Sequence, residues 1–168
     1  MSSNTPPQPN QIEVSLFGPG FGESALIHVG NGSWIVIDSC IDNRTGKTAA
    51  LHYFDSIGVD PSKAIKCVVA THWHDDHVKG IASILRISEQ ARFVLSQCLR
   101  RDEFLDLVGG YNSRNAIVGG TGVSELGECI QILRERNRLH KKHPHPMFAS
   151  ANKLVFRLAA NMSGHGNV

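Results

Sequence analysis

The sequence predicts one domain of the mixed α/β (α+β) class, and two patterns carry this prediction. Near the amino terminus, short alternating segments are separated by glycine-rich turns, which is typical of an antiparallel β-meander. Farther along, apolar runs alternate with helically spaced apolar residues, which is typical of strands joined by helices. The chain has 168 residues, of which 41% are hydrophobic and 19% charged, so a globular domain is expected. We assign it to residues 12–168, after a disordered tail at residues 1–11.

Three strands are expected to open the domain. Residues 12–17 alternate apolar and polar side chains, as a half-buried strand should, and residues 25–29 form a second such segment. Asn31-Gly32 is a favoured tight hairpin turn, which leads into a third strand at residues 34–37.

The rest of the chain is expected to alternate helices with strands. Residues 45–57 show helical spacing, with Asn43 as the cap and Gly58 as the stop. A nearly continuous apolar run at residues 65–70 predicts a central strand. The later elements are expected as a helix from residue 78, a strand at 93–95, a helix at 99–108, a helix capped by Ser124, and a strand at 154–158.

The helix after Ser124 carries an apolar face and a cationic end. The buried face is expected to hold Leu126, Cys129, Ile130 and Leu133. The cationic end has two interpretations: a solvated helix end that complements the helix dipole, or a patch for an anionic substrate. The solvated end is the more common arrangement. The cations concerned are Arg134, Arg136, Arg138, Lys141 and Lys142.

The run Thr71-His72-Trp73-His74-Asp75-Asp76-His77 directly follows the strand expected at residues 65–70. Imidazole nitrogens are strong ligands for zinc and related ions, and a carboxylate compensates charge. In an extended backbone, His72 and His74 project to one side because side chains alternate with a period of two. Asp76 and His77 follow one turn later and can face a second, adjacent site.

The alternative is a polar loop with chance histidines. However, four unligated groups of this kind at the end of a buried strand would crowd together at a desolvation cost unless something binds them. The sequence therefore predicts metal ligands at His72, His74, Asp76 and His77.

The pattern H-x-H-x-D-H after a strand, followed by Val78-Lys79-Gly80, resembles the signature of the metallo-β-lactamase superfamily. In that family an aspartate that closes an earlier strand supports the site, and Trp34-Ile35-Val36-Ile37-Asp38-Ser39 matches it in type and order. The resemblance extends from about residue 12 to about residue 95. It implies a four-layer αββα sandwich built from two similar halves, of which this chain carries the amino-terminal part.

The resemblance also implies a metallohydrolase. His72 and His74 would hold one ion, and Asp76 and His77 a second. Zinc is the expected metal, with two ions in a complete site and manganese or iron as alternatives. A metal-activated water would attack a carbonyl or phosphoryl centre, with Asp76 as the catalytic residue that orients the water. Asp38 would steady the ligands from behind.

Members of the family with two metals use further ligands downstream of the motif. His165 is the candidate for the third histidine of the first site, whereas His140, His143 and His145 lie in a basic segment broken by prolines. No aspartate follows Asp106, so the usual bridging aspartate has no match. We therefore expect a domain truncated at its carboxyl terminus, or a shortened relative that needs a partner chain. Such a chain would leave sheet faces and edges uncovered.

Composition and charge restrict the partners. A net charge of +2 is too weak to indicate a nucleic-acid partner, and no apolar stretch has the length of a membrane span. The first ten residues lack the pattern of a signal peptide. The cysteines Cys40, Cys67, Cys98 and Cys129 form no C-x-x-C pair, so reduced thiols in the cytoplasm are expected.

A cytoplasmic hydrolase acting on a small ester or a phosphodiester is the leading hypothesis. Its rival is a metal-binding or partner-binding module without activity, which the missing downstream ligands support. A di-iron redox protein of the same fold is disfavoured, because that group places a glutamate where His74 stands.

Overall fold

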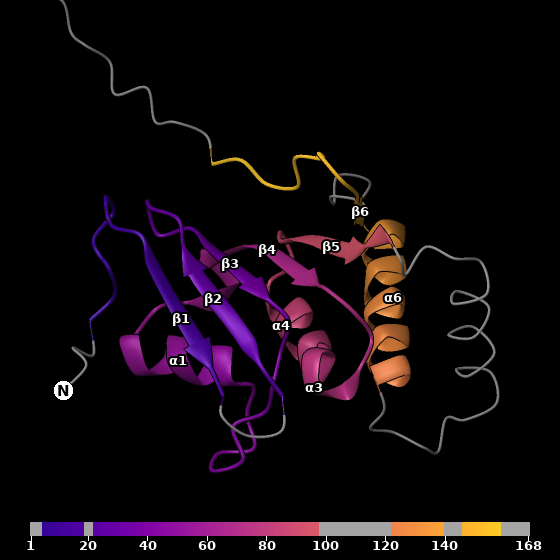
Figure 1. The fold of residues 1–168 in the computed structure, drawn as a ribbon, viewed down its shortest axis with the longest axis horizontal. Helices are drawn as coiled ribbons and strands as arrows, with labels where there is room; N and C mark the ends of the chain where they lie inside the picture. The colour runs from indigo at the N-terminus through magenta and orange to yellow at the C-terminus, as the bar shows by residue number, and fades with distance from the viewer. Residues whose placement is uncertain (1–4, 19–21, 98–121, 140–145, 159–168) are drawn as a thin grey trace, which may run out of the picture.

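The computed structural model describes residues 5–18, 22–97, 122–139 and 146–158. They form one six-stranded sheet in the order β1-β2-β3-β4-β5-β6, with the helices behind it in the view of Figure 1. The strands are β1 (Glu13–Phe17), β2 (Ser24–His28), β3 (Trp34–Ile37), β4 (Ile65–Ala70), β5 (Arg92–Ser96) and β6 (Met147–Ala149). The helices are α1 (Ala49–Ile57), α2 (Pro61–Ala64), α3 (Asp75–Val78), α4 (Ile81–Ile87) and α6 (Gly122–Leu139).

The sheet is antiparallel at its start and parallel afterwards. Strands β1, β2 and β3 form the predicted meander, with Leu26 opposite Val36. From β3 onward each strand is parallel to the next, with Val36 opposite Val68 and Val68 opposite Phe93. The bounds predicted for the strands at residues 34–37 and 65–70 are confirmed. The prediction of a mixed α/β fold is therefore confirmed.

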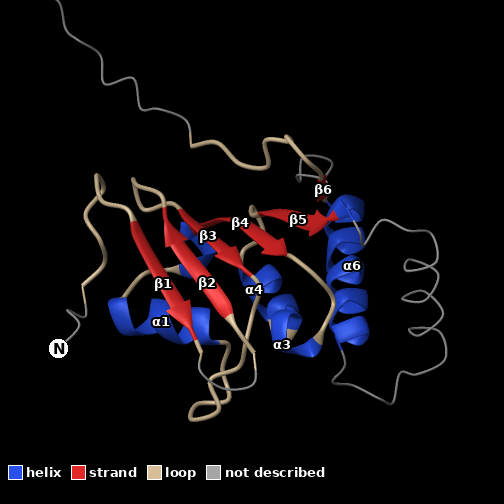
Figure 2. Cartoon of the chain, viewed as in Figure 1, coloured by secondary structure: helices blue, strands red, loops and turns tan. Residues whose placement is uncertain are grey.

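One hydrophobic core joins the sheet to its helices (Figure 2). The side chains of Trp34, Val68 and Phe93 point to the helical side and are 0–1% exposed. Phe54 of α1, fully buried, meets Trp34 edge to face with ring centroids 5.3 Å apart. This packing fixes α1 against β2 and β3 and so positions the loop that precedes the helix.

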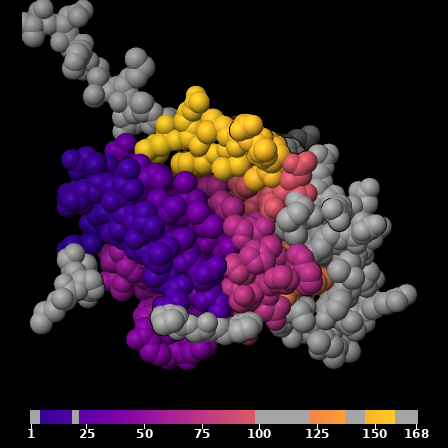
Figure 3. All heavy atoms as spheres, viewed as in Figure 1, coloured from indigo at the N-terminus to yellow at the C-terminus, as the bar shows by residue number. Residues whose placement is uncertain are grey.

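The other sheet face is also apolar but only partly covered. Val14 and Leu16 of the edge strand β1 are 59% and 78% exposed on it. The segment at residues 146–158 runs along one border of this face (Figure 3), and Arg92 of β5 donates a hydrogen bond to the carbonyl of Val155 at 3.2 Å.

Helix α1 begins later than the spacing predicts. The cap is Thr48 instead of Asn43, because residues 42–46 form a tight turn in which the amides of Thr45 and Gly46 donate to the carbonyl of Asp42. Gly58 ends the helix in the left-handed conformation, as predicted.

The single helix predicted from residue 78 is two short helices. Lys79 is extended and Gly80 is left-handed, with φ of 87°, so the chain turns between α3 and α4. The side chains of Thr48 and Ile41 fill the space that a Cβ at this position would need. Only glycine allows the short helix α3 to pack this closely against the loop before α1.

Helix α6 begins at Gly122, so Ser124 lies inside its first turn and the prediction of a Ser124 cap is wrong. Leu126, Cys129 and Leu133 are buried as predicted. Ile132, 8% exposed, is the fourth core residue on this helix, whereas Ile130 is only partly buried.

Arg136 does not belong to a solvated helix end. It is 8% exposed and donates a hydrogen bond to the carbonyl of Leu85 in α4. Burial lowers the pKa of its guanidinium. Arg136 therefore fastens α6 to α4, while Arg134 is exposed.

The last strand also differs from the prediction. β6 spans Met147–Ala149, with Phe148 opposite Leu95 of β5, and residues 154–158 form no strand. The predicted helix at residues 99–108 lies outside the described residues. In the part of the chain that the structure describes, no helix combines the length and apolar character needed to cross a membrane.

We predict that Gly80→Ala destabilises the fold more than Gly46→Ala does. Both glycines are left-handed, so both substitutions lose roughly 1–2 kcal/mol to backbone strain. At residue 80 the new Cβ also meets Thr48 and lies 2.9 Å from Ile41 Cδ1, whereas nothing lies within 4 Å at residue 46. Overpacking adds about 1–3 kcal/mol. Urea unfolding followed by tryptophan fluorescence measures the difference, and equal losses would contradict the packing at Gly80.

Candidate metal centre

The candidate centre lies where two parallel strands end side by side. Asp38 directly follows β3, and Thr71 and His72 directly follow β4. Because Ile37 pairs with Val69 in a parallel register, the two strand ends reach the same edge of the sheet. Ligands commonly bind at this edge in α/β folds.

Asp38 turns its side chain toward the end of β4. Its backbone is left-handed, with φ of 58°, a conformation that Asp and Asn tolerate better than most residues. Its amide donates to the carbonyl of Val69 at 2.8 Å, which continues the strand pairing by one residue. Asp38 is only 6% exposed, so its carboxylate needs partners inside the protein.

Three hydrogen bonds supply these partners. Oδ1 of Asp38 accepts from the amide of Thr71 at 2.8 Å. Oδ2 accepts from the hydroxyl of Thr71 at 2.6 Å and pairs with Nδ1 of His77 at 3.0 Å. A carboxylate can only accept, so Nδ1 of His77 carries the hydrogen and Nε2 is left with a lone pair for a ligand. Histidines that bind metals are commonly held in this way by an outer carboxylate.

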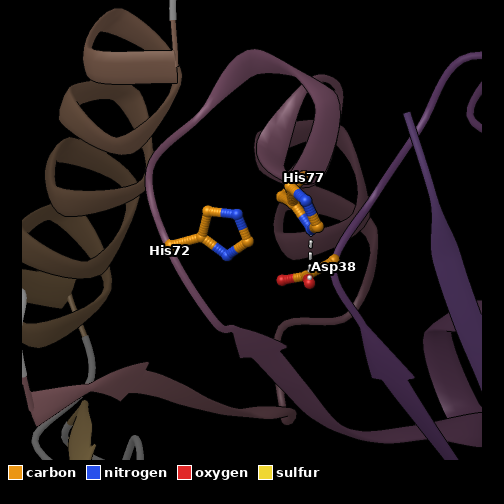
Figure 4. Close-up of side chains that lie close together, drawn as sticks. All are labelled: Asp38, His72 and His77. Carbon is orange, nitrogen blue, oxygen red and sulfur yellow. Dashed lines mark hydrogen bonds and ion pairs between the residues drawn. The ribbon is translucent and has the colours of Figure 1, made fainter. Parts of the chain in front are cut away.

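The two histidines and the aspartate converge on one point (Figure 4). Their potential ligand atoms all lie within 4.8 Å of one another, and the ring centroids of His72 and His77 are 3.6 Å apart. Two imidazoles, one of them held from behind by the Asp38 carboxylate, give nitrogen donors that suit zinc and related divalent ions. The residues present therefore fit a divalent metal ion.

Helix α3, which carries His77, is held by the backbone of two loops. The amide of Glu23 donates to the carbonyl of Asp76 at 2.9 Å, and the amide of Ser39 donates to the carbonyl of His77 at 2.7 Å. Gly22 lies so close to α3 that a Cβ there would be 2.8 Å from the carbonyl oxygen of Asp76. These contacts fix the helix and with it the His77 ring.

The other two predicted ligands flank this cluster. The ring of His74 lies 5.2 Å from that of His72, centroid to centroid, and the residue is exposed. Oδ2 of Asp76 lies 3.6 Å from Nε2 of His77, and the Asp76 side chain is 45% exposed. The division of the four ligands between two ions remains a prediction. His165 lies outside the described residues, as do His140, His143 and His145.

Two residues of the motif make contacts that sequence reasoning did not predict: Thr71 was given no role, and Asp75 was expected to face away or to touch substrate. Thr71 contacts both Asp38 and His72 through its hydroxyl, and a hydroxyl residue directly before the first histidine is the signal that could have indicated it. Asp75 accepts a hydrogen bond from the amide of Gly122 and so joins the motif to the start of α6.

A cavity of about 570 Å³ opens between the β1–β2 turn, the loop after β3, and α1. Gly22 and Cys40 belong to its wall and also lie on the segments that hold the metal centre. Sequence reasoning did not identify this cavity. Its lining residues are Phe17, Gly18, Gly22, Cys40, Ile41, Asp42, Asn43, Arg44, Ala49, His52, Tyr53 and Ser56.

The cavity has an aromatic wall and a charged rim. The rings of Phe17 and Tyr53 lie 5.7 Å apart, centroid to centroid. Asp42 accepts from Nε and Nη2 of Arg44, each at 3.2 Å, and pairs with Nδ1 of His52 at 3.0 Å. The hydrogen bonds from Arg44 hold the pKa of the Asp42 carboxyl well below its usual range.

Residues 17–94 match the family model of the metallo-beta-lactamase superfamily. Over these residues the chain is similar to that superfamily. The match includes β2 to β4, the motif, and Asp38, so the elements that form the centre all lie in the matched segment. No curated protein matches the chain. The resemblance predicted from the motif is confirmed for this part of the chain.

We predict that Asp38→Asn weakens zinc binding by about 10–100-fold, the usual loss when an outer partner of a metal ligand is changed. Asparagine tolerates the left-handed backbone, but its amide nitrogen would face hydrogen-bond donors, so one of the contacts with Thr71 or His77 is lost. Competition with a chromophoric chelator measures the dissociation constant.

The matched control is Asp55→Asn. The Asp55 side chain is 58% exposed on α1 and pairs with Lys47. The zinc affinity of the Asp55→Asn variant should equal that of the wild type. Equal affinities for both variants and the wild type would contradict the role of Asp38.

Proposed function

We propose that the protein is a metal-dependent hydrolase that uses an activated water molecule on an ester or phosphodiester-type substrate. The observation that supports this proposal best is the convergence of Asp38, His72 and His77 at the strand ends of a metallo-beta-lactamase superfamily segment. A hydrolase of this kind needs nitrogen and oxygen ligands on a rigid edge that solvent can reach.

The proposed metal ligands are His72, His74, Asp76 and His77. His72 and His77 are supported by their shared cluster, and His74 by its ring contact with His72. We expect zinc, with two ions in a complete site. Manganese or iron would accept the same donors.

A divalent ion held there would supply Lewis-acid activation of water near neutral pH. The side chains of the protein hold the ligand rings in place, and Asp76 supplies a carboxylate that can accept a proton. Asp38 holds the ring of His77 through Nδ1, which leaves Nε2 for a ligand, 3.6 Å from Oδ2 of Asp76. Asp76 reaches both solvent and His77, and we assign to it the orientation of the attacking water.

The substrate is proposed to extend into the cavity beside the centre. Its volume of about 570 Å³ falls within the roughly 300–1,000 Å³ that is typical of small-molecule sites. The rings of Phe17 and Tyr53 would contact an apolar group, and the exposed Arg44 would contact an anionic one. These features favour a small molecule over a nucleic acid.

We further propose a reducing compartment such as the cytoplasm. Cys40, Cys67 and Cys129 are free and buried. Burial raises the pKa of the Cys67 thiol to about 11, which keeps it protonated and unreactive.

The second candidate is a metal-binding or partner-binding module without activity. It is favoured by the small donor set, since the cluster within the described residues has two imidazoles and a carboxylate that already accepts three hydrogen bonds. Turnover by protein loaded with metal separates the two candidates.

We predict that the zinc-loaded or manganese-loaded protein hydrolyses bis(4-nitrophenyl) phosphate or 4-nitrophenyl acetate. His72→Ala and His77→Ala should each lower kcat/KM by about 100-fold or more, because a lost ligand costs at least as much as a lost outer partner. Release of 4-nitrophenolate measures both reactions.

The control is Lys66→Ala. Lys66 is exposed near the amino end of β4, at the opposite end of the strand from the centre. The activity of the Lys66→Ala variant should therefore match that of the wild type. Full metal loading without turnover of either substrate would reject the hydrolase and favour the module.

A further inference from the structure

Thr71 lies between the buried carboxylate and the first histidine of the motif. Its Oγ1 is 2.6 Å from Oδ2 of Asp38 and 2.8 Å from Nδ1 of His72. A threonine hydroxyl has one hydrogen to donate, and a carboxylate can only accept. The hydroxyl therefore donates to Asp38, and its oxygen accepts from His72.

This order of donors fixes the protonation of the His72 ring. To donate to Thr71, Nδ1 of His72 must carry a hydrogen, which leaves the lone pair of the neutral ring on Nε2. His77 reaches the same state through its direct bond to Asp38. One carboxylate thus holds both rings in the same tautomer, directly on one side and through a hydroxyl on the other.

We propose that Thr71 is a positioning residue that holds His72 in the Nδ1–H tautomer and so presents Nε2 to the metal. The proposal rests on the proposed metal centre but not on hydrolysis. Outer partners that set the tautomer of a ligand histidine commonly tune metal affinity.

The Thr71 side chain can be changed without disturbing the surrounding fold, so its role toward His72 can be tested by itself. The Thr71 amide donates to Oδ1 of Asp38 at 2.8 Å independently of the side chain. Thr71 is exposed, so loss of its hydroxyl opens no cavity. Valine keeps the shape and β-branching of threonine and replaces the hydroxyl with a methyl group, whereas serine keeps the hydroxyl.

The experiment compares Thr71→Val with Thr71→Ser in the full chain. In metal-free protein at about pH 8, where model imidazoles are neutral, the ¹⁵N shifts of the histidine rings report the tautomer. We expect the wild type and the serine variant to hold His72 as Nδ1–H. The valine variant should shift His72 toward a mixture and leave His77 unchanged.

Zinc affinity, measured by chelator competition, is the second readout. Thr71→Val should raise the dissociation constant by about 10–100-fold, whereas Thr71→Ser should stay close to the wild type. Thr71→Ala also lacks the hydroxyl and should show the same changes as Thr71→Val. It replaces the valine variant in the test if valine disturbs folding. His72 shifts and zinc affinities that are the same in the valine, alanine and serine variants would overturn the proposal.

The outcome is distinguishable from failure of the proposed function. If the protein hydrolyses neither chromogenic substrate but the hydroxyl still controls the His72 tautomer, Thr71 keeps its role and the hydrolase is rejected. If turnover occurs and the valine variant keeps the wild-type tautomer and affinity, the hydrolase stands and the role of Thr71 is rejected.

Discussion

The carboxylate of Asp38 is the group on which the geometry of the centre depends. A buried carboxylate is costly unless several donors stabilise it, and here the amide and hydroxyl of Thr71 and the ring of His77 do so. The same three bonds fix the loop after β4 and the ring carried by α3. The stabilisation of one charge therefore also builds the metal centre. This explains why an aspartate stands at a left-handed position directly after a buried strand.

The fold supplies this carboxylate at the right place through parallel pairing. β3 and β4 are neighbours, so the residues that follow them meet at one edge of the sheet. The loops after β1 and β3 then hold α3 by backbone hydrogen bonds from Glu23 and Ser39. Beside them, the cavity lined by Phe17, Arg44 and Tyr53 shares these loop segments. Metal ligands and a substrate-sized space are thus fixed by the same segments.

The sequence predicts the strands and the motif well, because the signals there are local. The apolar run at residues 65–70 and the ligands after it need no distant information. The division between α3 and α4 was missed because it depends on Thr48 and Ile41 packing against Gly80, a contact between distant segments. The strand at residues 147–149 was missed because three residues are too few to show a local period, and the strand is defined by its pairing with β5. The cavity likewise forms only when α1 packs beside the β1–β2 turn.

X-ray absorption at the zinc edge of the reconstituted protein tests the central claim most directly. The outer-shell scattering of coordinated imidazole reports how many histidines bind the ion. The account predicts bound zinc with a first shell of nitrogen and oxygen and at least two imidazoles, which His72 and His77 supply. A protein that takes up no zinc, or zinc surrounded by oxygen alone with no imidazole scattering, would contradict it.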